Sequence, residues 1–263
     1  MKEVKCLILA AGLGTRLLHL TDNWPKCLMP IGERPLLEYW LETICVTKVN
    51  AVLVNLHHHS EIVKEFLDRP RFKGWVHSVY EETLLGTAGT LRVNKDFFNN
   101  CTTLFVHADN WCQCDFTDFM IYHQKHRPNH CLITMMTFET DTPETCGIVE
   151  TDADGVVQAF HEKKKKTPGN HANGAVYLME PDVLKWIEKN PTNSDFSTGV
   201  LPNFSGRIAT WKNGGIHKDI GVPQILRMAQ NDPQPNSFWP QKDTWQKNFL
   251  KHPIHNQITK VVV

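Results

Sequence analysis

The sequence lacks an excess of charge of either sign. Its 263 residues include 28 lysines and arginines and 28 aspartates and glutamates, so the formal net charge is zero. Proteins that bind nucleic acid or an anionic membrane through electrostatic attraction usually carry a basic excess. The composition therefore favours neither partner, and any basic site must be local.

Long hydrophobic runs are also absent. No apolar run approaches the roughly 18 residues that span a membrane, and the N-terminal residues lead into a predicted strand without the apolar region of a signal peptide. We therefore expect no membrane segment and a cytoplasmic location. The hydrophobic content of 41% is still sufficient for the core of a large α/β domain.

Cysteine pairs with the spacing of a zinc site are missing. Cys112 and Cys114 form a C-x-C pair that could bind a soft metal, but no partner pair accompanies it. Reduced thiols are the expected state. Three consecutive histidines, His57, His58 and His59, also suggest a metal. Because neighbouring residues of a strand point to opposite faces, the three cannot all bind one ion, and we interpret them as a strand end.

Two common glycine-rich signatures are incomplete. The motif Leu7–Arg16 reads LILAAGLGTR, but a dinucleotide fingerprint would need a third glycine where Leu17 stands, and the lysine of a P-loop is missing. The small residues 10–14 nevertheless let the backbone turn closely around a bulky ligand after the apolar strand 4–9. Arg16 and Lys26 add positive charge, so the motif predicts a triphosphate-binding loop.

Short apolar runs alternate with amphipathic stretches in the first half of the chain, which predicts an α/β fold with a mainly parallel sheet flanked by helices. Past Gly147 the pattern indicates antiparallel strands on the same sheet. We expect strands at 4–9, 51–55, 75–80, 103–107, 131–138, 147–151, 156–161 and 175–179, and helices at 35–47, 60–67, 89–98, 115–126 and 181–189. Lys163–Lys166 would form a charged loop. The expected catalytic domain is 1–230, and 231–263 would be an extension packed on it or an oligomer contact.

Five motifs in a fixed order carry a family resemblance. The chain resembles the sugar-1-phosphate nucleotidyltransferases over about residues 4–230, and most closely the mannose- and heptose-1-phosphate guanylyltransferases. The motifs are Gly12–Arg16, Pro25–Lys26, Leu85–Gly89, Ala108–Asp109 and Asp219–Gly221. The resemblance implies a Rossmann-like fold and an enzyme of nucleotide-sugar and polysaccharide biosynthesis, which joins a nucleoside triphosphate to a sugar 1-phosphate and releases pyrophosphate.

The resemblance also implies roles for individual residues. Arg16, Lys26 and Lys163 would be catalytic, and Asp109 and Asp219 would bind Mg²⁺, which prefers oxygen ligands. The sugar phosphate would contact Gly147, Glu162, Lys163 and Asn173. The nucleotide would contact Leu9, Ala10, Ala11, Gly12, Gly14, Thr15, Glu82, Gly86, Thr87 and Ala88.

The implied reaction needs no general base, because the second pKa of a phosphate monoester lies near 6 and the attacking oxygen is already anionic. We expect direct in-line displacement without a covalent enzyme intermediate.

Gly199 stands where an acidic residue is usual in the family, His217 where an aromatic is usual, and Val222 where threonine is frequent. These departures leave the acceptor open. GTP is the favoured donor. A uridylyl- or cytidylyltransferase acting on an amino-sugar phosphate or a non-sugar phosphate, and a non-catalytic nucleotide-sugar sensor, remain alternatives. A homo-oligomer is possible.

Overall fold

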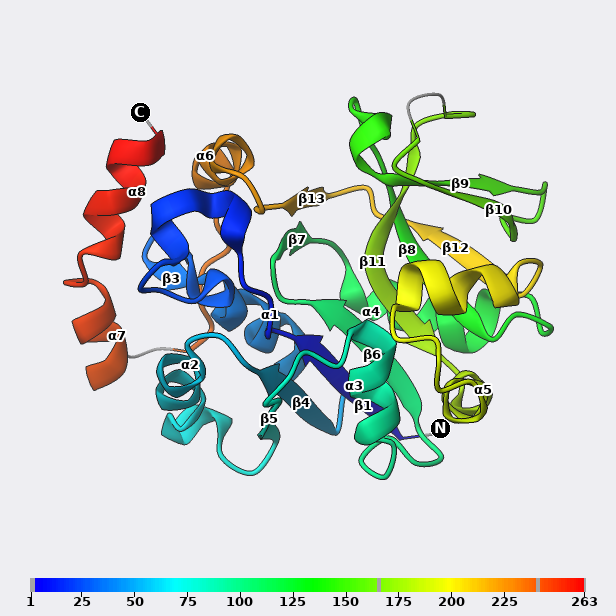
Figure 1. The fold of residues 1–263 in the computed structure, drawn as a ribbon, viewed down its shortest axis with the longest axis horizontal. Coiled ribbons are helices and arrows are strands. Elements are labelled where there is room, and N and C mark those ends of the chain that lie inside the picture. The colour runs from blue at the N-terminus through cyan, green and yellow to red at the C-terminus, as the bar shows by residue number, and fades with distance from the viewer. Residues whose placement is uncertain (1–2, 165–166, 240–241, 263) are drawn as a thin grey trace. The chain divides into compact units, whose positions relative to one another are not determined.

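The computed structural model describes residues 3–164, 167–239 and 242–262, which form two compact units (Figure 1). The first unit contains residues 3–7, 85–106 and 113–217, and the second contains residues 8–84, 107–112 and 218–262. Lys165 and Lys166 of the expected charged loop lie outside the described residues. The chain therefore passes between the units several times, and both halves of the sequence contribute to each unit.

The first unit is built on strands that meet at a long central one. β11 (His171–Met179) pairs antiparallel with β6 (Thr102–His107), β8 (Ile133–Glu139) and β9 (Gly147–Thr151). β10 (Val157–Glu162) extends the sheet beside β9, and β12 (Ile208–Lys212) pairs in parallel with β8. The helical segments of this unit are α3 (Thr87–Val93), α4 (Phe116–Ile121), η4 (Tyr122–His126), η5 (Pro143–Thr145), α5 (Pro181–Lys189), η6 (Phe196–Val200) and η7 (Leu201–Phe204).

The second unit has a parallel strand pair, β4 (Ala51–Leu56) and β5 (Val76–Tyr80), joined through α2 (Ser60–Leu67). Parallel neighbours require such a crossover connection. β1 (Val4–Leu9) ends in this unit, and β7 (Asn110–Gln113) and β13 (Ile216–Asp219) each run from one unit into the other along the chain. The remaining elements are η1 (Thr15–Thr21), η2 (Lys26–Leu28), β2 (Pro30–Ile31), β3 (Arg34–Pro35), α1 (Leu36–Cys45), η3 (Pro70–Phe72), α6 (Pro223–Asn231), α7 (Thr244–Phe249) and α8 (Ile254–Val262).

The α/β class is confirmed, with parallel pairing in the first half of the chain and mainly antiparallel pairing in the second. Several expected boundaries were wrong, and the largest differences concern one helix and one strand. The helix expected at 89–98 begins at Thr87 and ends at Val93, because Gly86 turns the chain with φ +77° just before it. The strand expected to begin at residue 175 begins at His171, and a bulge with Ala175 at φ +52° interrupts its pairing. The short strands β7, β12 and β13 were not predicted.

The C-terminal segment packs on the second unit through polar groups buried on α1. Glu38 and Glu42 lie one turn apart and are both buried, so they share a face of this helix. Glu38 pairs with Arg69, which also donates to Asp243 at 2.7 Å. Glu42 accepts from the Ser237 hydroxyl and the Phe238 N–H in the same segment.

Aromatic rings complete this packing. Trp24 lies 5.9 Å from Phe249 and 4.2 Å from His252 between ring centroids, and Phe66 lies 4.9 Å from Trp245. Figure 1 shows α8, in red, beside the blue segment that contains η1. Residues 242–262 are therefore part of the fold of the second unit.

The arrangement around Asp243 gives a stability prediction. Its side chain caps α7 by accepting from the Gln246 N–H and also meets Arg69 and Arg71. Asp243→Asn keeps a capping oxygen but removes the charge, so we expect a loss of about 1–3 kcal/mol of unfolding free energy at pH 7, measured by urea titration. Asp243→Ala should lose about 1 kcal/mol more, because the cap is also removed.

Burial alone raises the pKa of the Asp243 carboxyl, but the arginines and the Gln246 N–H outweigh this effect and hold it below the ordinary value of 3.8. The charge then stabilises the fold fully above that ordinary value, and the stabilisation is lost as the pH falls through the lower folded pKa. The difference between wild type and Asp243→Asn should therefore shrink below about pH 3.8. An equal difference at pH 7 and pH 3 would contradict this role.

Candidate active site

The predicted phosphate loop leaves β1 and changes from buried to exposed within a few residues. Ala10 and Ala11 are buried after Leu9, whereas Gly12, Thr15 and Arg16 are exposed. The loop therefore has an anchored beginning and an accessible tip. An accessible tip with small residues is the arrangement that a bulky phosphate ligand requires.

Gly14 allows this loop to approach Lys26. Its φ of +68° favours glycine, and a Cβ atom there would lie 2.9 Å from Thr21 Cγ2 and 3.1 Å from Lys26 Cβ. The Thr21 hydroxyl donates to the Gly14 carbonyl at 3.1 Å. A side chain at position 14 would force the loop away from Lys26.

Four charged side chains meet in the second unit. Lys26 Nζ donates to Asp109 Oδ2 at 2.6 Å and to Asp219 Oδ1 at 3.1 Å, and the Arg16 guanidinium donates to Asp219 Oδ2 at 3.2 Å. The Lys26 side chain is only 8% exposed, whereas that of Asp219 is 47% exposed. The structure thus brings together four of the predicted residues in one charge-balanced cluster.

The backbone fixes how the two carboxylates approach each other. Asp109 follows β6, and the neighbouring Ala108 N–H donates to the Leu9 carbonyl at 3.0 Å. Asp219 ends β13, and the Ile220 N–H donates to the Asp109 carbonyl at 3.1 Å. A Cβ atom at Gly221 would lie 2.6 Å from an Arg16 terminal nitrogen, so this glycine leaves room for the arginine.

The electrostatics of the cluster keep Asp109 ionised. Burial raises the pKa of the Asp109 carboxyl. The Lys26 ammonium and His107 lower this pKa by more than burial raises it, so it lies below the ordinary value. The Asp109 carboxylate therefore attracts a cation at neutral pH. Among the described residues no group of three or more His, Cys, Asp and Glu side chains could hold a metal. Two carboxylates still suit Mg²⁺, which takes its other oxygens from water and phosphate.

The predicted sugar-side residues lie in the first unit, where Gly147 and Glu162 are partners in the register of β9 and β10. A Cβ atom at Gly147 would lie 2.6 Å from the Phe160 ring and 2.9 Å from Glu162 Oε2, so the glycine makes room for both. Lys163 follows with φ +46°, and its ammonium lies 3.6 Å from Glu162 Oε1. Its side chain is 65% exposed, which leaves it accessible to a phosphate.

Asn173 uses both ends of its amide inside the protein. Its Oδ1 accepts from the Ala175 N–H at 2.9 Å, and its Nδ2 donates to the Tyr177 hydroxyl at 2.7 Å. Burial raises the pKa of that tyrosine, which stays protonated at neutral pH. Asn173 thus stabilises the bulge of β11 in this structure.

Gly86, Thr87 and Ala88 lie in the first unit at the start of α3, where Ser194 meets them. The Ala88 N–H donates to the Ser194 carbonyl at 2.8 Å, and a Cβ atom at Gly86 would lie 2.6 Å from the same oxygen. The Thr87 hydroxyl accepts from the Phe196 N–H at 2.6 Å. The packing of this segment therefore depends on residues 194–196.

The three departures from the family pattern have local structural consequences. A Cβ atom at Gly199 would lie 3.1 Å from Asn193, so an acidic side chain would be crowded there. His217 stacks on Phe138 at 4.3 Å and makes a 2.7 Å hydrogen bond to the Gly174 carbonyl. Val222 precedes α6 without a side-chain cap, which a threonine could supply.

The histidine interpretation needs correction. β4 ends at Leu56, and His58 and His59 follow it in a turn, so the alternation of a strand does not apply. Their rings lie 3.9 Å apart, and both Nε2 atoms meet the Thr21 carbonyl, at 3.3 and 3.0 Å. They contact the segment that follows the phosphate loop.

Sequence reasoning missed several residues around the loop. Glu82 is exposed, as expected for a ligand contact, whereas the adjacent Glu81 is buried and hydrogen-bonded to Asn55. Thr21 was missed as well. The signal for Asn55 was a single polar residue within an apolar strand, AVLVNL.

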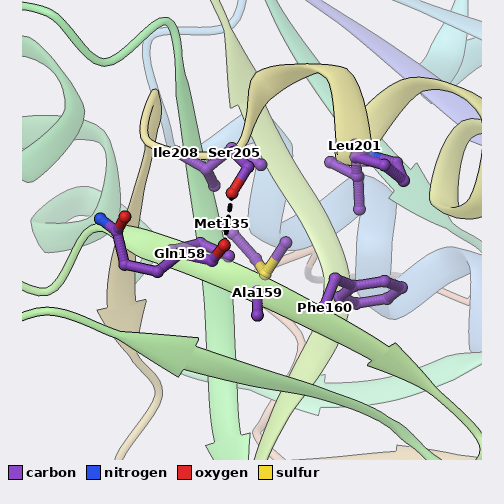
Figure 2. A pocket seen from close by; sticks show the side chains of 9 residues that line it. Met135, Gln158, Ala159, Phe160, Leu201, Ser205 and Ile208 are labelled. Atoms are coloured by element: carbon purple, nitrogen blue, oxygen red, sulfur yellow. Dashed lines mark hydrogen bonds between the residues drawn. The ribbon is translucent and has the colours of Figure 1, made fainter.

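A cavity of about 200 Å³ lies in the first unit (Figure 2). Its lining is mostly apolar, and none of the predicted site residues line it. Figure 2 shows the Ser205 side chain directed at Gln158, whose carbonyl accepts from the serine hydroxyl at 2.6 Å. The lining residues are Met135, Val157, Gln158, Ala159, Phe160, Leu201, Pro202, Ser205 and Ile208.

The chain is similar to curated proteins that carry a specific enzymatic name. It is 27% identical over 225 residues to a mannose-1-phosphate guanylyltransferase catalytic subunit beta of Dictyostelium discoideum. It is 27% identical over 227 residues to a mannose-1-phosphate guanyltransferase of Saccharomyces cerevisiae. Each match covers 84% of this chain and 62% of the relative, so the chain spans less than two thirds of the length of these proteins.

A solved structure of UDP-glucose pyrophosphorylase with UDP-glucose has a similar fold, with a TM-score of 0.74 at 21% identity, covering 88% of this chain and 98% of that one. Within the part of the chain that is described, no helix is long and apolar enough to span a membrane. Residues 5–233 match the family described as "Nucleotidyl transferase", so the resemblance is confirmed and the chain belongs to this family.

Proposed function

We propose that the protein transfers a nucleotidyl group from a nucleoside triphosphate, with GTP as the favoured donor, to a sugar 1-phosphate, and releases pyrophosphate. The observation that carries the proposal is the Lys26 ammonium held between Asp109 and Asp219 beside the exposed loop 12–16. Family membership supports the reaction type. The names of the relatives support a guanylyl group and mannose 1-phosphate.

Lys26 and Arg16 supply the positive charge that the reaction needs. The α-phosphorus is attacked by an acceptor phosphate oxygen that is already anionic near neutral pH, so no side chain must remove a proton. Negative charge then accumulates on the oxygens around phosphorus. An ammonium and a guanidinium positioned beforehand stabilise that charge more than they stabilise the bound substrates.

Asp109 and Asp219 are the residues that would hold Mg²⁺. When bound, the ion neutralises phosphate charge and orients the triphosphate. The two carboxylates keep their position without it because Lys26 takes the place of a cation. In this role the lysine has two possible partners, the carboxylates in the free protein and the phosphate in the complex.

The acceptor would be bound by residues of the first unit. Glu162 offers carboxylate oxygens that accept from vicinal sugar hydroxyls, and Gly147 leaves the space beside it open. The exposed Lys163 ammonium provides a flexible charge for the sugar phosphate. Asn173 would act on the acceptor indirectly, by stabilising the bulge in β11.

The function is tested by incubating the protein and Mg²⁺ with each nucleoside triphosphate against a panel of phosphates, while pyrophosphate release is followed. The panel includes mannose, heptose, glucose and amino-sugar 1-phosphates and phosphocholine. We expect the highest rate with GTP and mannose or heptose 1-phosphate. Labelled GTP alone should leave no label on the protein, because the displacement is direct. Absence of pyrophosphate release with every pair would refute the proposal.

Lys26→Met should distinguish the two proposed roles of the lysine, which are to stabilise the transition state and to balance the two carboxylates in the free protein. We expect kcat to fall by about 10²- to 10³-fold, because one stabilising charge is lost in the transition state. Binding of Mn²⁺ without nucleotide, followed by electron paramagnetic resonance, should become tighter, because the ammonium no longer competes for the carboxylates.

Lys64→Met, on the exposed face of α2, is the control and should change neither property. If Lys26→Met weakened Mn²⁺ binding, the role of the lysine as a stand-in cation would be wrong.

Lys163→Ala tests the acceptor side. Loss of a charged hydrogen bond to phosphate should raise the KM for the sugar phosphate about tenfold or more and leave the KM for the triphosphate nearly unchanged. The neighbouring exposed Lys164 offers a matched control, since Lys164→Ala changes the same net charge. Equal effects of the two substitutions would indicate a general electrostatic effect instead of a specific contact.

A further inference from the structure

Asn55 is a buried polar residue in an otherwise apolar strand. It lies near the end of β4 and is only 3% exposed, and both ends of its amide are used. The Ala10 N–H donates to Asn55 Oδ1 at 2.8 Å, and Asn55 Nδ2 donates to Glu81 Oε1 at 2.9 Å. Three segments that are distant in sequence are thereby joined by one side chain.

Glu81 is an equally unusual residue at this depth, because it is 4% exposed. It directly follows β5, and its N–H donates to the Leu56 carbonyl at 2.8 Å, which fixes it beside the end of β4. Its own carbonyl lies 2.8 Å from His57 Nδ1. A buried carboxylate is costly unless it is hydrogen-bonded, and Asn55 supplies such a bond.

The chemistry of the partners fixes the orientation of the amide. A backbone N–H can only donate and an ionised carboxylate can only accept, so the Asn55 oxygen faces Ala10 and its nitrogen faces Glu81. Asparagine satisfies both partners, whereas leucine would satisfy neither and an ionised aspartate would offer Glu81 no donor. The residue type is therefore determined by the two neighbours.

We propose that Asn55 and Glu81 are positioning residues for the phosphate loop. This inference rests on the proposed function and extends it to residues that do not themselves touch the reacting groups. Ala10 is the first residue after β1, and the preceding Leu9 carbonyl is held by the Ala108 N–H. The beginning of the loop is thus held from two sides, and the exposed residues from Gly12 onward diverge from a fixed point.

The position of the loop should determine affinity for the triphosphate more than affinity for the acceptor. The backbone groups of the loop must converge on phosphate oxygens, and small displacements weaken such contacts strongly. If Asn55 and Glu81 only stabilised the fold, their substitution would lower stability without a selective rise in the KM for the triphosphate. The two roles can therefore be separated by comparing the two KM values.

Asn55→Asp, Glu81→Gln and the double variant test the proposal. The carboxylate introduced by Asn55→Asp can accept from the Ala10 N–H, but its second oxygen then faces the Glu81 carboxylate, and the pair is tolerated only while it shares a proton. The KM for the triphosphate should be near the wild-type value at low pH and rise about tenfold as the pH increases and the shared proton is lost. Glu81→Gln keeps an acceptor for Asn55 and should remain close to wild type.

The double variant should restore the wild-type behaviour. The amide introduced by Glu81→Gln can donate to the carboxylate introduced by Asn55→Asp, while that carboxylate still accepts from the Ala10 N–H. Its pH profile should be flat, and the KM for the sugar phosphate should change less than twofold in all variants.

Asn213→Asp is the matched control. Asn213 is also a buried asparagine that accepts from a backbone N–H, but it lies in the first unit. Its substitution should change stability without the pH-dependent KM.

Failure of the double variant to restore the KM, or a flat profile for Asn55→Asp, would overturn the proposal. Urea unfolding of each variant identifies simple misfolding.

If wild type turned over no substrate, the proposed function would fail, yet the positioning role would still be measurable by hydrogen exchange of residues 10–14. Asn55→Asp should then exchange faster than the Asn213→Asp control at high pH, and the double variant should not. Equal hydrogen-exchange rates of residues 10–14 in Asn55→Asp and Asn213→Asp would also contradict the proposal.

Discussion

The Lys26 ammonium between Asp109 and Asp219 is the interaction on which the candidate site depends. Two carboxylates brought to the same point repel each other unless a cation lies between them. Here the protein supplies that cation itself, from a side chain that is 8% exposed. The arrangement therefore exists before any ligand binds. In the proposed function the same lysine balances the carboxylates in the free protein and meets the phosphate of the bound substrate. Substrate binding would then redistribute charge within a cluster that is already assembled.

Backbone packing makes this close approach possible. Gly14 and Gly221 each lack a side chain at a point where a Cβ atom would meet Lys26 or Arg16. The Ile220 N–H then joins the two aspartate-bearing segments directly through the Asp109 carbonyl. Every residue except proline has the backbone N–H and carbonyl that form this hydrogen bond, so the sequence does not reveal it. The sequence shows only that glycines occur near the charged residues. The exposed tip of the loop and the fixed lysine are consequences of one local packing arrangement.

Much of this could be predicted from the sequence because it depends on local patterns. Apolar runs and turn residues predicted the α/β class, and ordered motifs predicted that Arg16, Lys26, Asp109 and Asp219 serve one site. Long-range geometry could not be predicted in the same way. β12 returns in parallel beside β8, and the bulge of β11 depends on a tyrosine and an asparagine side chain. Glu81 was missed because charge alone does not reveal which of two adjacent carboxylates is buried.

Asn55 and Asn173 show how internal hydrogen bonds change the interpretation of a polar residue. Asn55 and Asn173 each accept from a backbone N–H and donate to a side-chain oxygen, of Glu81 and Tyr177 respectively. An amide is the side chain that can satisfy such a pair of partners at once. Both ends of each amide are hydrogen-bonded within the protein. If such an amide turned to bind a ligand, the hydrogen bonds that hold the local backbone would be lost. Exposed charged groups such as Arg16 and Lys163 carry no comparable cost. The internally bonded amides therefore fix the backbone, and in the proposed function ligand binding falls to the charged side chains and loop N–H groups that this backbone presents.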